Sequence, residues 1–572
     1  MNKNIFTKLM FKRTILLVIL TVLVSLSHSF VVTTYAYSNI PVEVRIGLFF
    51  NDSQTGQYSA VSSFVANANG GLSIGCFANG KLDHLMEYQQ GTPLVVSKDS
   101  FYIKSDDKTT EYDPSLEQTL KGEKMGPYHV KIGDVFADYA SLGSELLKIQ
   151  EKGIDAYPVY DDGWQIWTGF YVDENDAEMA VLYLISPILG EKDYKVISPS
   201  PSRISVSSEG GKTVLLFDSK SHVFTIKPGG ESKPGFIRLD GDDSKRYRGR
   251  IEVQRFLGSD MTLINVLPME EYLYGVVPCE IQAGSHPEAL KAQAVAARTY
   301  TVNNLKKYER LNFNMCATTY SQVYRGFNGE AGATSKAIDD TRGEIVTYEG
   351  KPASIFYFSS SGGKTEDVKN VWGSDGYPYL VSVEDKYESG KSWHYNWENS
   401  FTAQRIKEIM VGRGFNIGDI LGIHITKRSE AGRAVEVVLR GSKGERVYKN
   451  SLTRDFLSLD SQWYDIITDA DTLVKKNELP PSRIQIAGKK IMTATGLKTL
   501  DTSKKTVKAL LTEGATKIIP LTPTVYTFKG KGWGHAVGMS QEGAKGMAEA
   551  GFTYDKILTH YFTGTKVEQA DF

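Results

Sequence analysis

A single glutamate, Glu280, stands where this sequence could place an acid–base catalyst. It closes the segment 263–280, whose apolar run ends at Pro278, and it comes just before a strong helix start. A carboxylic acid at such an edge, partly shielded from water, can have a raised pKa and donate a proton at neutral pH. The position of Glu280 therefore predicts proton transfer by one carboxyl group.

The residues that follow predict a closely packed helix. Residues 285–288 form a capping-box start, with Pro287 where the missing N–H of proline is tolerated. The small residues of 289–300 allow close contact with other elements. Gln293 and Arg298 are polar residues within this run of small residues, and they are either site residues or solvated surface positions.

Three later segments also have unusual composition. Residues 316–326 begin with a cysteine and end in a polar, tyrosine-containing stretch. Residues 356–366 predict an apolar strand that breaks into a Ser/Gly loop, which either grips a polar ligand or is a simple turn. This loop lacks the glycine spacing of a phosphate loop. Residues 530–544 are rich in glycine, which indicates unusual dihedral angles or close approach, and their one imidazole, His535, is a candidate site residue.

Together these four segments resemble the stage II sporulation protein D (SpoIID) and amidase-enhancer LytB family, over roughly residues 245–572. The matching motifs are Tyr247-Arg248-Gly249-x-Ile251-Glu252, Asn265-x-Leu267-x-x-x-x-Tyr272-Leu273-x-Gly275-Val276-Val277-Pro278-x-Glu280, Leu290-Lys291-Ala292-Gln293-Ala294-Val295-Ala296-Ala297-Arg298-Thr299-Tyr300 and Gly532-Trp533-Gly534-His535-x-x-Gly538-Met539-Ser540-Gln541-x-Gly543-Ala544. One departure from the family is Ala536, where glycine is frequent.

The resemblance implies a lytic transglycosylase that cleaves the glycan of peptidoglycan, preferably strands stripped of stem peptides, and leaves a 1,6-anhydromuramic product. Glu280 matches the catalytic acid of the family. One carboxyl group suffices for this reaction, whereas hydrolytic glycosidases commonly use two. The residues predicted to bind substrate are Arg298, Gln322, Tyr324, Ser361, His535, Ser540 and Gln541.

Two other functions remain open at this point. Amidase enhancers in the same family imply a non-catalytic protein that binds the wall and stimulates a separate N-acetylmuramoyl-L-alanine amidase. A purely structural wall-binding protein is the third alternative. The partners expected are therefore glycan strands and, in the second alternative, an amidase.

The cysteines argue against a cofactor. Family members that bind zinc carry a Cys-x-x-x-His-Cys-Gln segment, but here Cys316 is followed by Tyr320 and Ser321 at the His and Cys places. One thiolate is far short of four zinc ligands, so we expect no metal and no other cofactor. Cys279, beside Glu280, is predicted to be a small packed residue.

The overall composition predicts an α+β multidomain protein. A chain of 572 residues is too long for one ordinary core. The net charge of −1 gives no electrostatic argument for binding nucleic acid or anionic membranes. Three cysteines without a close pair exclude a dense disulfide framework.

The predicted organisation has four parts. Residues 1–36 have the basic start, apolar run and small-residue site of a signal peptide, or form an uncleaved anchor. We therefore expect an exported protein, extracellular, in the wall or anchored facing it, with membrane contact only through that segment. Residues 37–125 predict a β-rich region with a linker from about residue 104, and 201–572 a mixed α+β SpoIID-like domain with an insertion at about 469–521.

Residues 126–190 predict a small α/β module: a strand, a helix over 138–150, a hairpin and a second helix. This order resembles the SPOR domain, a peptidoglycan-binding module, although an unrelated α+β domain is the alternative. If the resemblance holds, Tyr139, Trp164 and Trp167 could stack on sugar rings. The two tryptophans should face opposite sides of one strand, so at most one meets a ligand, and core packing is favoured for Trp164.

Overall fold

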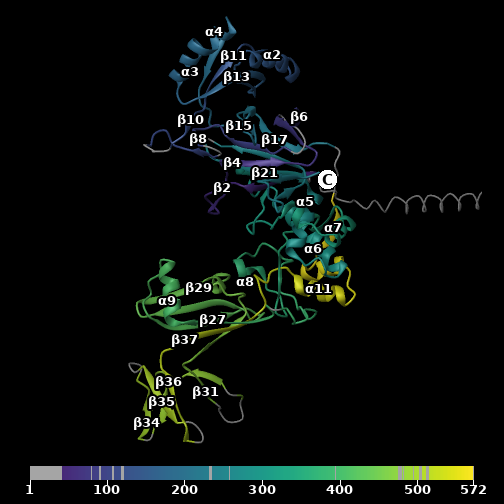
Figure 1. Ribbon diagram of the computed structural model, residues 1–572. Coiled ribbons are helices and arrows are strands. Elements are labelled where there is room, and N and C mark those ends of the chain that lie inside the picture. The colour runs from purple at the N-terminus through teal and green to yellow at the C-terminus, as the bar shows by residue number, and fades with distance from the viewer. Residues whose placement is uncertain are drawn as a thin grey trace, which may run out of the picture.

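The computed structural model describes residues 41–570, apart from 79, 89–91, 106–107, 117–120, 231–234, 257, 393, 475–479, 481, 494, 502–504 and 511–513. The predicted targeting segment, residues 1–36, lies outside the described residues. The α+β multidomain class is confirmed, with several sheets and helices along an elongated molecule (Figure 1). No helix among the described residues is long and apolar enough to cross a membrane.

Two large sheets form the upper part of the molecule. The first has the order β22 (Met315–Cys316), β1 (Glu43–Phe49), β21 (Met261–Pro268), β20 (Arg250–Arg255), β17 (Val223–Pro228), β5 (Leu72–Ala78) and β6 (Lys81–Tyr88). The second has the order β14 (Tyr194–Ile197), β11 (Tyr128–Ile132), β13 (Trp164–Tyr171), β12 (Ala156–Tyr160), β16 (Thr213–Asp218), β15 (Arg203–Ser208), β7 (Leu94–Lys98), β4 (Ser63–Asn67), β18 (Ile237–Leu239) and β19 (Arg246–Tyr247).

These sheets combine strands that are far apart in sequence. Strand β1 pairs with β21, and β7 pairs with β15, so the regions predicted as 37–125 and 201–572 are hydrogen-bonded to one another. The polar stretch from residue 104, predicted as a linker, carries ordered strands. Strand β8 (Tyr102–Ser105) lies between β10 (Glu123–Met125) and β9 (Lys108–Glu111).

Residues 128–197 fold as strand, helix, two strands, helix and strand. Helix α2 (Tyr139–Glu151) begins at the predicted place, because Asp138 accepts a hydrogen bond from the Ser141 N–H at 2.8 Å. The second helix is irregular: α3 (Glu174–Ala180) continues through a π-helical turn (Val181–Ile185) into α4 (Ser186–Leu189). Strand β12 pairs with β16, which joins this module to the second sheet.

The two tryptophans of the module face opposite sides of β13, as predicted, but both are buried. Trp164 is 5% exposed and packs against Tyr139, with ring centroids 4.9 Å apart. Trp167 is 1% exposed, and its indole N–H donates to Gln165 at 3.0 Å. Neither tryptophan can reach a sugar ring in this conformation, which corrects the expectation of a stacking role for these residues.

A helical layer lies below the sheets and contains α5 (Met269–Glu280), α6 (Pro287–Asn303), α7 (Gly332–Asp340), α8 (Val368–Trp372), α11 (Gln541–Glu549) and α12 (Tyr554–Tyr561). Short strands join it: β23 (Glu344–Tyr348), β24 (Lys351–Pro352), β39 (Lys566–Gln569), β25 (Tyr357–Phe358) and β38 (Met539–Ser540). Its apolar side chains share one continuous core with the two sheets. This layer therefore holds its helices rigidly against the upper part of the molecule.

A second body with its own core lies beyond the helical layer, which the sequence did not indicate (Figure 1). It contains β26 (Asn396–Thr402), α9 (Ala403–Gly412), β27 (Ile420–Arg428), β28 (Ala434–Gly441), β29 (Gly444–Lys449), α10 (Leu452–Asp455), β30 (Tyr464–Thr468) and β37 (Val525–Lys531). The predicted insertion follows β30 as three hairpins: β31 (Asp471–Val474) with β32 (Ser482–Gln485), β33 (Lys490–Thr493) with β34 (Gly496–Thr499), and β35 (Thr506–Leu510) with β36 (Thr516–Pro520).

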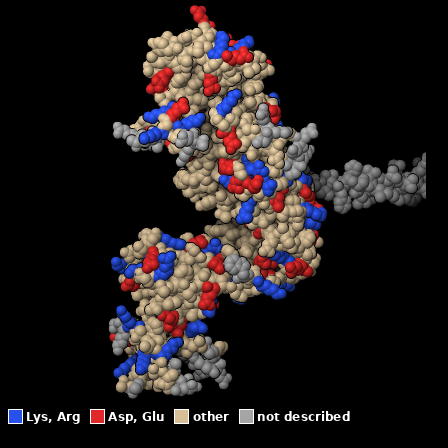
Figure 2. Space-filling model, in the orientation of Figure 1, with Lys and Arg blue, Asp and Glu red and all other residues tan. Residues whose placement is uncertain are grey.

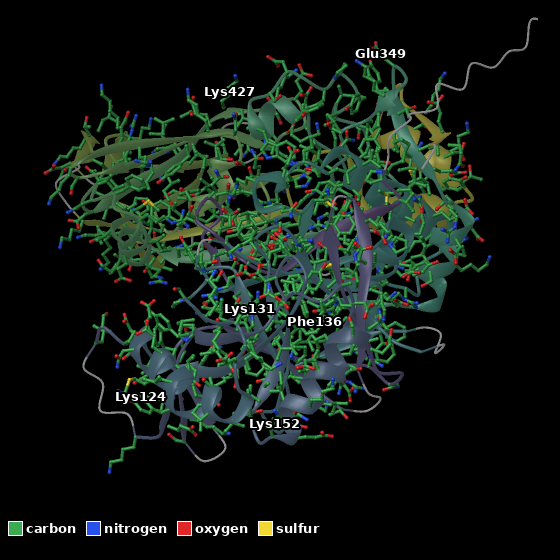
Figure 3. All side chains as sticks on the ribbon, turned by 90° about the horizontal axis from the view of Figure 1, so that it is seen from above. Lys124, Lys131, Phe136, Lys152, Glu349 and Lys427 are labelled. Atoms are coloured by element: carbon green, nitrogen blue, oxygen red, sulfur yellow. The ribbon has the colours of Figure 1, made fainter. Side chains whose placement is uncertain are left out.

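The surface mixes both signs of charge. Lys and Arg side chains alternate with Asp and Glu over the face seen in Figure 2, without a large basic patch there. The view from above places Lys124 and Lys152 at one edge of the molecule and Glu349 and Lys427 at the opposite edge (Figure 3). This distribution agrees with the net charge of −1.

Candidate functional site

Glu280 is the last residue of helix α5 and lies, as predicted, at a break between two regular elements. Pro278 lies within the last turn and lacks an N–H, so a normal helical hydrogen bond is missing there and the helix ends soon afterwards. Helix α6 begins at Pro287. Its N-cap is His286, whose ring accepts from the Glu288 N–H at 3.3 Å, rather than Ser285 as the capping-box pattern predicted.

A glycine on α5 lets a distant segment approach Glu280. A Cβ atom on Gly275 would lie 2.6 Å from the Tyr324 ring and 2.8 Å from the Gly326 carbonyl oxygen. The Gly275 carbonyl also accepts a hydrogen bond from the Arg325 N–H at 3.2 Å. This contact brings the backbone N–H of Val323 to the carboxyl group of Glu280, to which it donates a hydrogen bond.

The surroundings of Glu280 make it a weak acid. Burial raises the pKa of its carboxyl group to about 7, and the hydrogen bond from Val323 opposes this rise. Its place at the carboxyl end of α5 acts in the same direction as burial, because helix carbonyls disfavour a negative charge there. The side chain nevertheless keeps partial exposure to solvent. Glu280 can therefore hold a proton near neutral pH and still be reached.

Three tyrosines surround this carboxyl group, and none was singled out from the sequence. Burial raises the pKa of Tyr300 to about 12, and the charges of Cys316 and Glu280 add to the rise. Burial and the Glu280 charge also hold the pKa of Tyr357 well above its usual value, and Glu280 acts on Tyr272 in the same direction. All three hydroxyl groups are neutral at pH 7, and all three are close enough to Glu280 for its charge to raise their pKa values.

Gln322, a predicted site residue, connects these hydroxyl groups. Its amide oxygen accepts from Tyr272 at 3.3 Å and from Thr301 at 3.0 Å. Its amide nitrogen donates to Tyr357 at 3.0 Å and to the Ala297 carbonyl at 3.4 Å. Gln322 is 2% exposed, so it orients the tyrosines from behind the site. Its location in a short polar motif was the signal that found it.

The Ser/Gly loop and the glycine-rich loop meet beside Tyr357. Strand β25 pairs in parallel with β38, which places Tyr357 opposite Met539. Ser540 then caps helix α11 by accepting from the Gly543 N–H at 3.0 Å, and it is fully buried. Gln541 is partly exposed and donates to the Gln293 side chain on α6 at 3.3 Å. Of these two predicted residues, Gln541 is the one that solvent can reach.

Arg298 lies at the wrong end of α5 for the predicted contact with substrate. Its guanidinium group donates to both carboxylate oxygens of Glu270, at 2.8 and 2.7 Å, and is fully buried. Glu270 precedes Glu280 on α5 by a distance of about 15 Å along the helix axis. Arg298 also donates to the carbonyls of Ile338 and Glu344. It therefore fastens helices α5, α6 and α7 together.

Two more predicted residues are structural in the same way. Tyr324 is 6% exposed and donates to the Asn265 side chain at 2.8 Å. Ser361 is fully buried, and its hydroxyl lies 2.7 Å from carboxylate oxygens of both Asp385 and Glu388. Burial raises the pKa of Glu388, and the hydrogen bonds from Ser360, Ser361 and the Gly362 N–H oppose this rise.

His535 supports the site from behind and is not a cation. Burial lowers the pKa of its imidazole to about 4. Nδ1 accepts from the Val537 N–H at 3.1 Å, and the ring also hydrogen-bonds the Tyr357 backbone. It packs against Phe358 and Trp372, with ring centroids 5.4 and 5.2 Å apart. The neutral imidazole therefore fixes the backbone on which Tyr357 is carried.

The neighbouring Ala536 has a backbone φ of +66°. This left-handed conformation is strained for a residue with a Cβ atom. The departure from the family pattern thus occurs at a position that glycine would fill without strain.

The cysteines show thiols in ordinary packing. Cys279 is partly buried and donates to the Gly275 carbonyl at 3.3 Å. Cys316 is buried and free, with Thr318 and Ser321 hydroxyls at 3.3 and 3.5 Å from its sulfur. Among the described residues no group of three or more His, Cys, Asp or Glu side chains could hold a metal ion. The expectation that the protein binds no metal stays a prediction.

Comparison with known proteins finds similarity over the segment that carries Glu280. The family model described as SpoIID, Stage II sporulation protein, matches residues 258–348. The chain is 31% identical over 352 residues to the amidase enhancer of Bacillus subtilis (strain 168), covering 59% of this chain and 46% of that protein. It therefore spans less than half the length of that relative.

The chain is also similar to two stage II sporulation proteins D. Identity is 28% over 374 residues for the Bacillus amyloliquefaciens protein, covering 63% of this chain and 91% of the relative. It is 28% over 320 residues for the Bacillus subtilis (strain 168) protein, covering 53% and 76%. The segment of this chain that contains Glu280 therefore matches the SpoIID family model, and the chain is similar to stage II sporulation proteins D and to an amidase enhancer.

Proposed function

We propose that this protein is an exported peptidoglycan lytic transglycosylase with Glu280 as its catalytic residue. The observation that carries the proposal is a single, partly exposed carboxyl group whose pKa burial raises to about 7. A general acid works best when its pKa lies near the working pH. The match to the SpoIID family model supports a role in the cell wall and in sporulation.

The proposed reaction uses Glu280 twice. Its neutral carboxyl group protonates the glycosidic oxygen as the bond from that oxygen to the muramic C1 breaks. The C6 hydroxyl of the same muramic residue attacks C1, and the Glu280 carboxylate takes the hydroxyl proton. One bond breaks and one forms, the carboxyl group is regenerated, and no water is consumed. The product ends in a 1,6-anhydro ring.

The groups around Glu280 suit this route. Among the described residues, no acidic side chain contributes to the pKa of Glu280, so no second carboxylate is evident to activate a water molecule. Hydrolytic glycosidases commonly need such a pair. The neutral hydroxyls of Tyr300 and Tyr357 can orient the muramic hydroxyls, and the Val323 N–H can stabilise the carboxylate after proton transfer.

The test is product analysis with purified glycan strands stripped of stem peptides. The wild-type chain should release anhydro-disaccharides detectable by mass spectrometry. Glu280→Gln should reduce the rate by about 10²- to 10⁴-fold, the usual contribution of a general acid. Glu271→Gln on the same helix is the matched control and should keep activity, because that carboxyl group lies among Arg248 and Glu330. Full activity of Glu280→Gln would exclude the proposed role.

A second candidate function is favoured by the similarity to the amidase enhancer. In that case the chain would bind the wall and stimulate an N-acetylmuramoyl-L-alanine amidase without cleaving glycan itself. Assaying a purified wall amidase with and without the chain separates the two functions. Stimulation that survives Glu280→Gln, with no anhydro product, would favour the enhancer. If the chain neither releases anhydro product nor stimulates the amidase, a structural wall-binding role is favoured.

We also propose that residues 126–190 bind peptidoglycan in the manner of a SPOR domain. The support is the order of elements, with strands β11, β13 and β12 side by side and two helical segments, while β14, just after residue 190, pairs with β11. The buried tryptophans remove the ligand contacts that the sequence suggested. A sacculus pull-down tests the module: a chain lacking 126–190 should bind less, and unchanged binding would contradict the proposal.

A further inference from the structure

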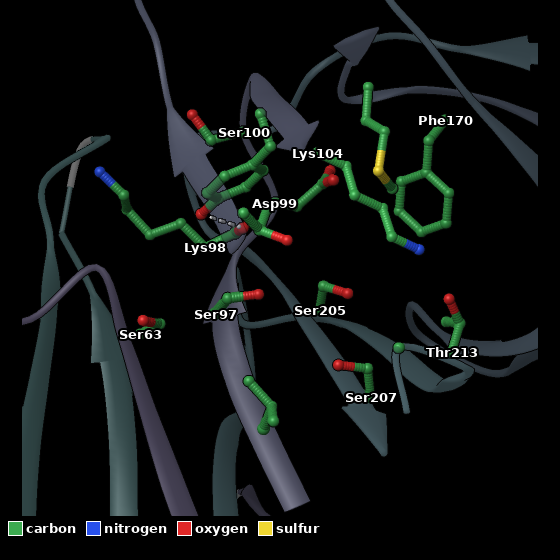
Figure 4. Close-up of a pocket in the computed structure, with 15 residues that line it drawn as sticks. Ser63, Ser97, Lys98, Asp99, Ser100, Lys104, Phe170, Ser205, Ser207 and Thr213 are labelled. Atoms are coloured by element: carbon green, nitrogen blue, oxygen red, sulfur yellow. Dashed lines mark hydrogen bonds between the residues drawn. The ribbon is translucent and has the colours of Figure 1, made fainter. Parts of the chain in front are cut away.

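A cavity of about 210 Å³ lies far from Glu280 in sequence, where the second sheet meets the small sheet formed by β10, β8 and β9 (Figure 4). Its lining comes from strands β4, β7, β15 and β16, from the small sheet, and from Phe170 at the end of β13. It is smaller than a typical drug-sized pocket of roughly 300–1,000 Å³, so it suits one small ligand.

A row of serines forms the floor of this cavity. Ser63, Ser97 and Ser205 lie directly opposite one another on the adjacent strands β4, β7 and β15. Their neighbours Phe64 and Val96 point to the other face of the sheet and are buried in the core. Because side chains alternate along a strand, all three hydroxyl groups point into the cavity.

The hydroxyl groups of the floor have unused hydrogen-bonding capacity. Ser207 and Thr213 face each other on β15 and β16 and extend the polar floor. Among the described residues, no protein partner is seen for the hydroxyls of Ser63, Ser97, Ser205, Ser207 or Thr213. A sheet face covered by other elements is normally apolar. Five unpaired hydroxyls in such a place form a built polar surface for a ligand with many hydroxyl groups.

The two lysines at the cavity differ in their charge compensation. Lys98 is 7% exposed and pairs with carboxylates of Glu111 at 2.8 Å and Asp260 at 2.7 Å. Lys104 is exposed and pairs with no carboxylate among the described residues. Its ammonium group lies over the β15–β16 turn, 3.9 Å from where a Cβ on Gly211 would be. Lys104 is therefore available for an anionic ligand.

The remaining charges do not cancel Lys104. Asp99, which lines the cavity, is buried and already bound by Arg203 at 2.6 Å and by His129 at 3.2 Å. Arg255 lies beside the same group and donates to the Asp99 carbonyl at 3.1 Å. Lys98, Arg203 and Arg255 together balance the three carboxylates of Asp99, Glu111 and Asp260. Lys104 is a further cation, and it is accessible to solvent.

One end of the cavity is apolar. Phe170 and Met125 contribute apolar side chains to the lining, and Figure 4 shows the Lys104 side chain reaching past Phe170 towards Thr213. The cavity thus offers an apolar wall, a floor of hydroxyl groups and one free ammonium group. A ligand that uses all three has an apolar ring face, several hydroxyl groups and one carboxylate.

From this geometry we infer that the cavity binds one hydroxyl-rich carboxylate of the size of a single sugar acid. N-acetylmuramic acid has this chemistry, because its lactyl carboxylate is free once the stem peptide is removed. Naming that sugar rests on the proposed function, whereas the preference for a hydroxyl-rich carboxylate rests on the cavity alone. The cavity would hold a strand end at a place separate from the cleavage site.

The experiment compares two sugars that differ in the carboxylate. Binding of N-acetylmuramic acid and N-acetylglucosamine to the purified chain is measured by saturation-transfer NMR and calorimetry. We expect N-acetylmuramic acid to bind about tenfold more tightly, the size expected for one charge-assisted contact. Lys104→Gln should abolish this difference, whereas Lys212→Gln, a charge loss on the nearby turn outside the cavity, should preserve it.

Two further variants keep the result interpretable. Ser97→Val, which keeps a strand-forming residue, should weaken both sugars, with thermal unfolding checking that the sheet is intact. Glu280→Gln should leave the sugar preference unchanged, because Glu280 does not line this cavity. Equal binding of the two sugars, or a preference that survives Lys104→Gln, would overturn the inference without affecting the proposed cleavage. If the wild-type chain shows the sugar preference but cleaves no glycan, the proposed cleavage is contradicted and the inference about the cavity stands.

Discussion

Glu280 combines two properties that usually oppose each other: enough burial to keep a proton, and enough exposure to reach a substrate. The proton is retained because burial and the end of α5 both disfavour the carboxylate. The Glu280 charge in turn raises the pKa values of Tyr272, Tyr300 and Tyr357. The single hydrogen bond from Val323 is too little to restore an ordinary pKa. At the scale of residues, acidity is therefore the property that this site controls.

The pH dependence of cleavage should follow the Glu280 carboxyl group. The neutral form is the proton donor, so kcat/KM should fall about tenfold for each pH unit above its pKa of about 7. The measurement is the initial rate of anhydro-product release from about pH 5 to about pH 9, a range that extends roughly two pH units on either side of the Glu280 pKa. A rate that rises through pH 7 would show that another group is the acid.

The same raised pKa also makes the stability of the chain depend on pH. Between the unfolded pKa of 4.5 and the folded value of about 7, the folded chain binds the extra proton, so its stability falls as pH rises through this window. Glu280→Gln removes this loss and should raise the free energy of unfolding at pH 8 by roughly 1–3 kcal/mol, with little change at pH 4. Urea unfolding at the two pH values checks the prediction.

At the scale of elements, the site depends on how closely the segment around Tyr324 approaches α5. Gly275 makes this approach possible, and the Arg298–Glu270 ion pair holds α5 against α6 and α7. Neither residue touches the reacting atoms. Both are positioning residues, and their substitution should separate effects on geometry from effects on chemistry.

Gly275→Ala should displace the Val323 N–H from Glu280, because the new Cβ would lie 2.6 Å from the Tyr324 ring. Overpacking of this kind costs about 1–3 kcal/mol of stability, and cleavage should be lost at temperatures where the chain is still folded. Gly284→Ala, in the loop after α5, meets nothing within 4 Å and is the control. Equal activity of the two variants would show that the close approach is unimportant.

Arg298→Met leaves Glu270 as an unpaired buried charge and should destabilise the chain by about 3–5 kcal/mol. Adding Glu270→Gln should recover most of this loss, because an amide needs no countercharge. The free energies of unfolding of the two single variants and the double variant provide the measurement. If Arg298 instead contacted substrate, the double variant would be stable and inactive.

At the scale of the whole molecule, strands from residues 43–98 share the upper sheets with strands from residues 203–316, while the three hairpins after β30 stand apart. The chain leaves and re-enters sheet β26–β37–β30 at neighbouring points, since Asp469 accepts from the Thr524 N–H at 2.9 Å. Strand β21, by contrast, has β1 as one of its two partners. The hairpins are therefore removable, and the N-terminal strands are not.

Replacing residues 472–520 by a short glycine-serine linker should change the melting temperature little and preserve cleavage of soluble strands. A chain that begins at residue 201, where the sequence suggested a domain boundary, lacks β1, β4, β5 and β7 and should aggregate or remain unfolded. Circular dichroism and size-exclusion chromatography test both. A soluble, cooperatively folding chain from residue 201 would contradict the sheet pairing.

The sequence by itself determined the local features of this protein. Local sequence patterns predicted three features: the position of Glu280 before a helix start, helix α2 with its Asp138 cap, and the alternation of side chains along the strands. Each of these patterns spans only a few neighbouring residues. Such patterns depend on near neighbours, so they can be recognised without knowing the fold. The same patterns also indicated that Trp164 and Trp167 lie on opposite faces of β13.

Only the tertiary structure decided what surrounds each side chain. Arg298 and Gln322 were equally plausible site residues in sequence. In the folded chain Arg298 pairs with Glu270, whereas Gln322 hydrogen-bonds Tyr357 near Glu280. The pKa of Glu280 depends on its burial and on the Val323 N–H, which comes from a distant segment. Burial and electrostatics are sums over neighbours in space, and for this reason the chemistry of Glu280 becomes visible only in the folded chain.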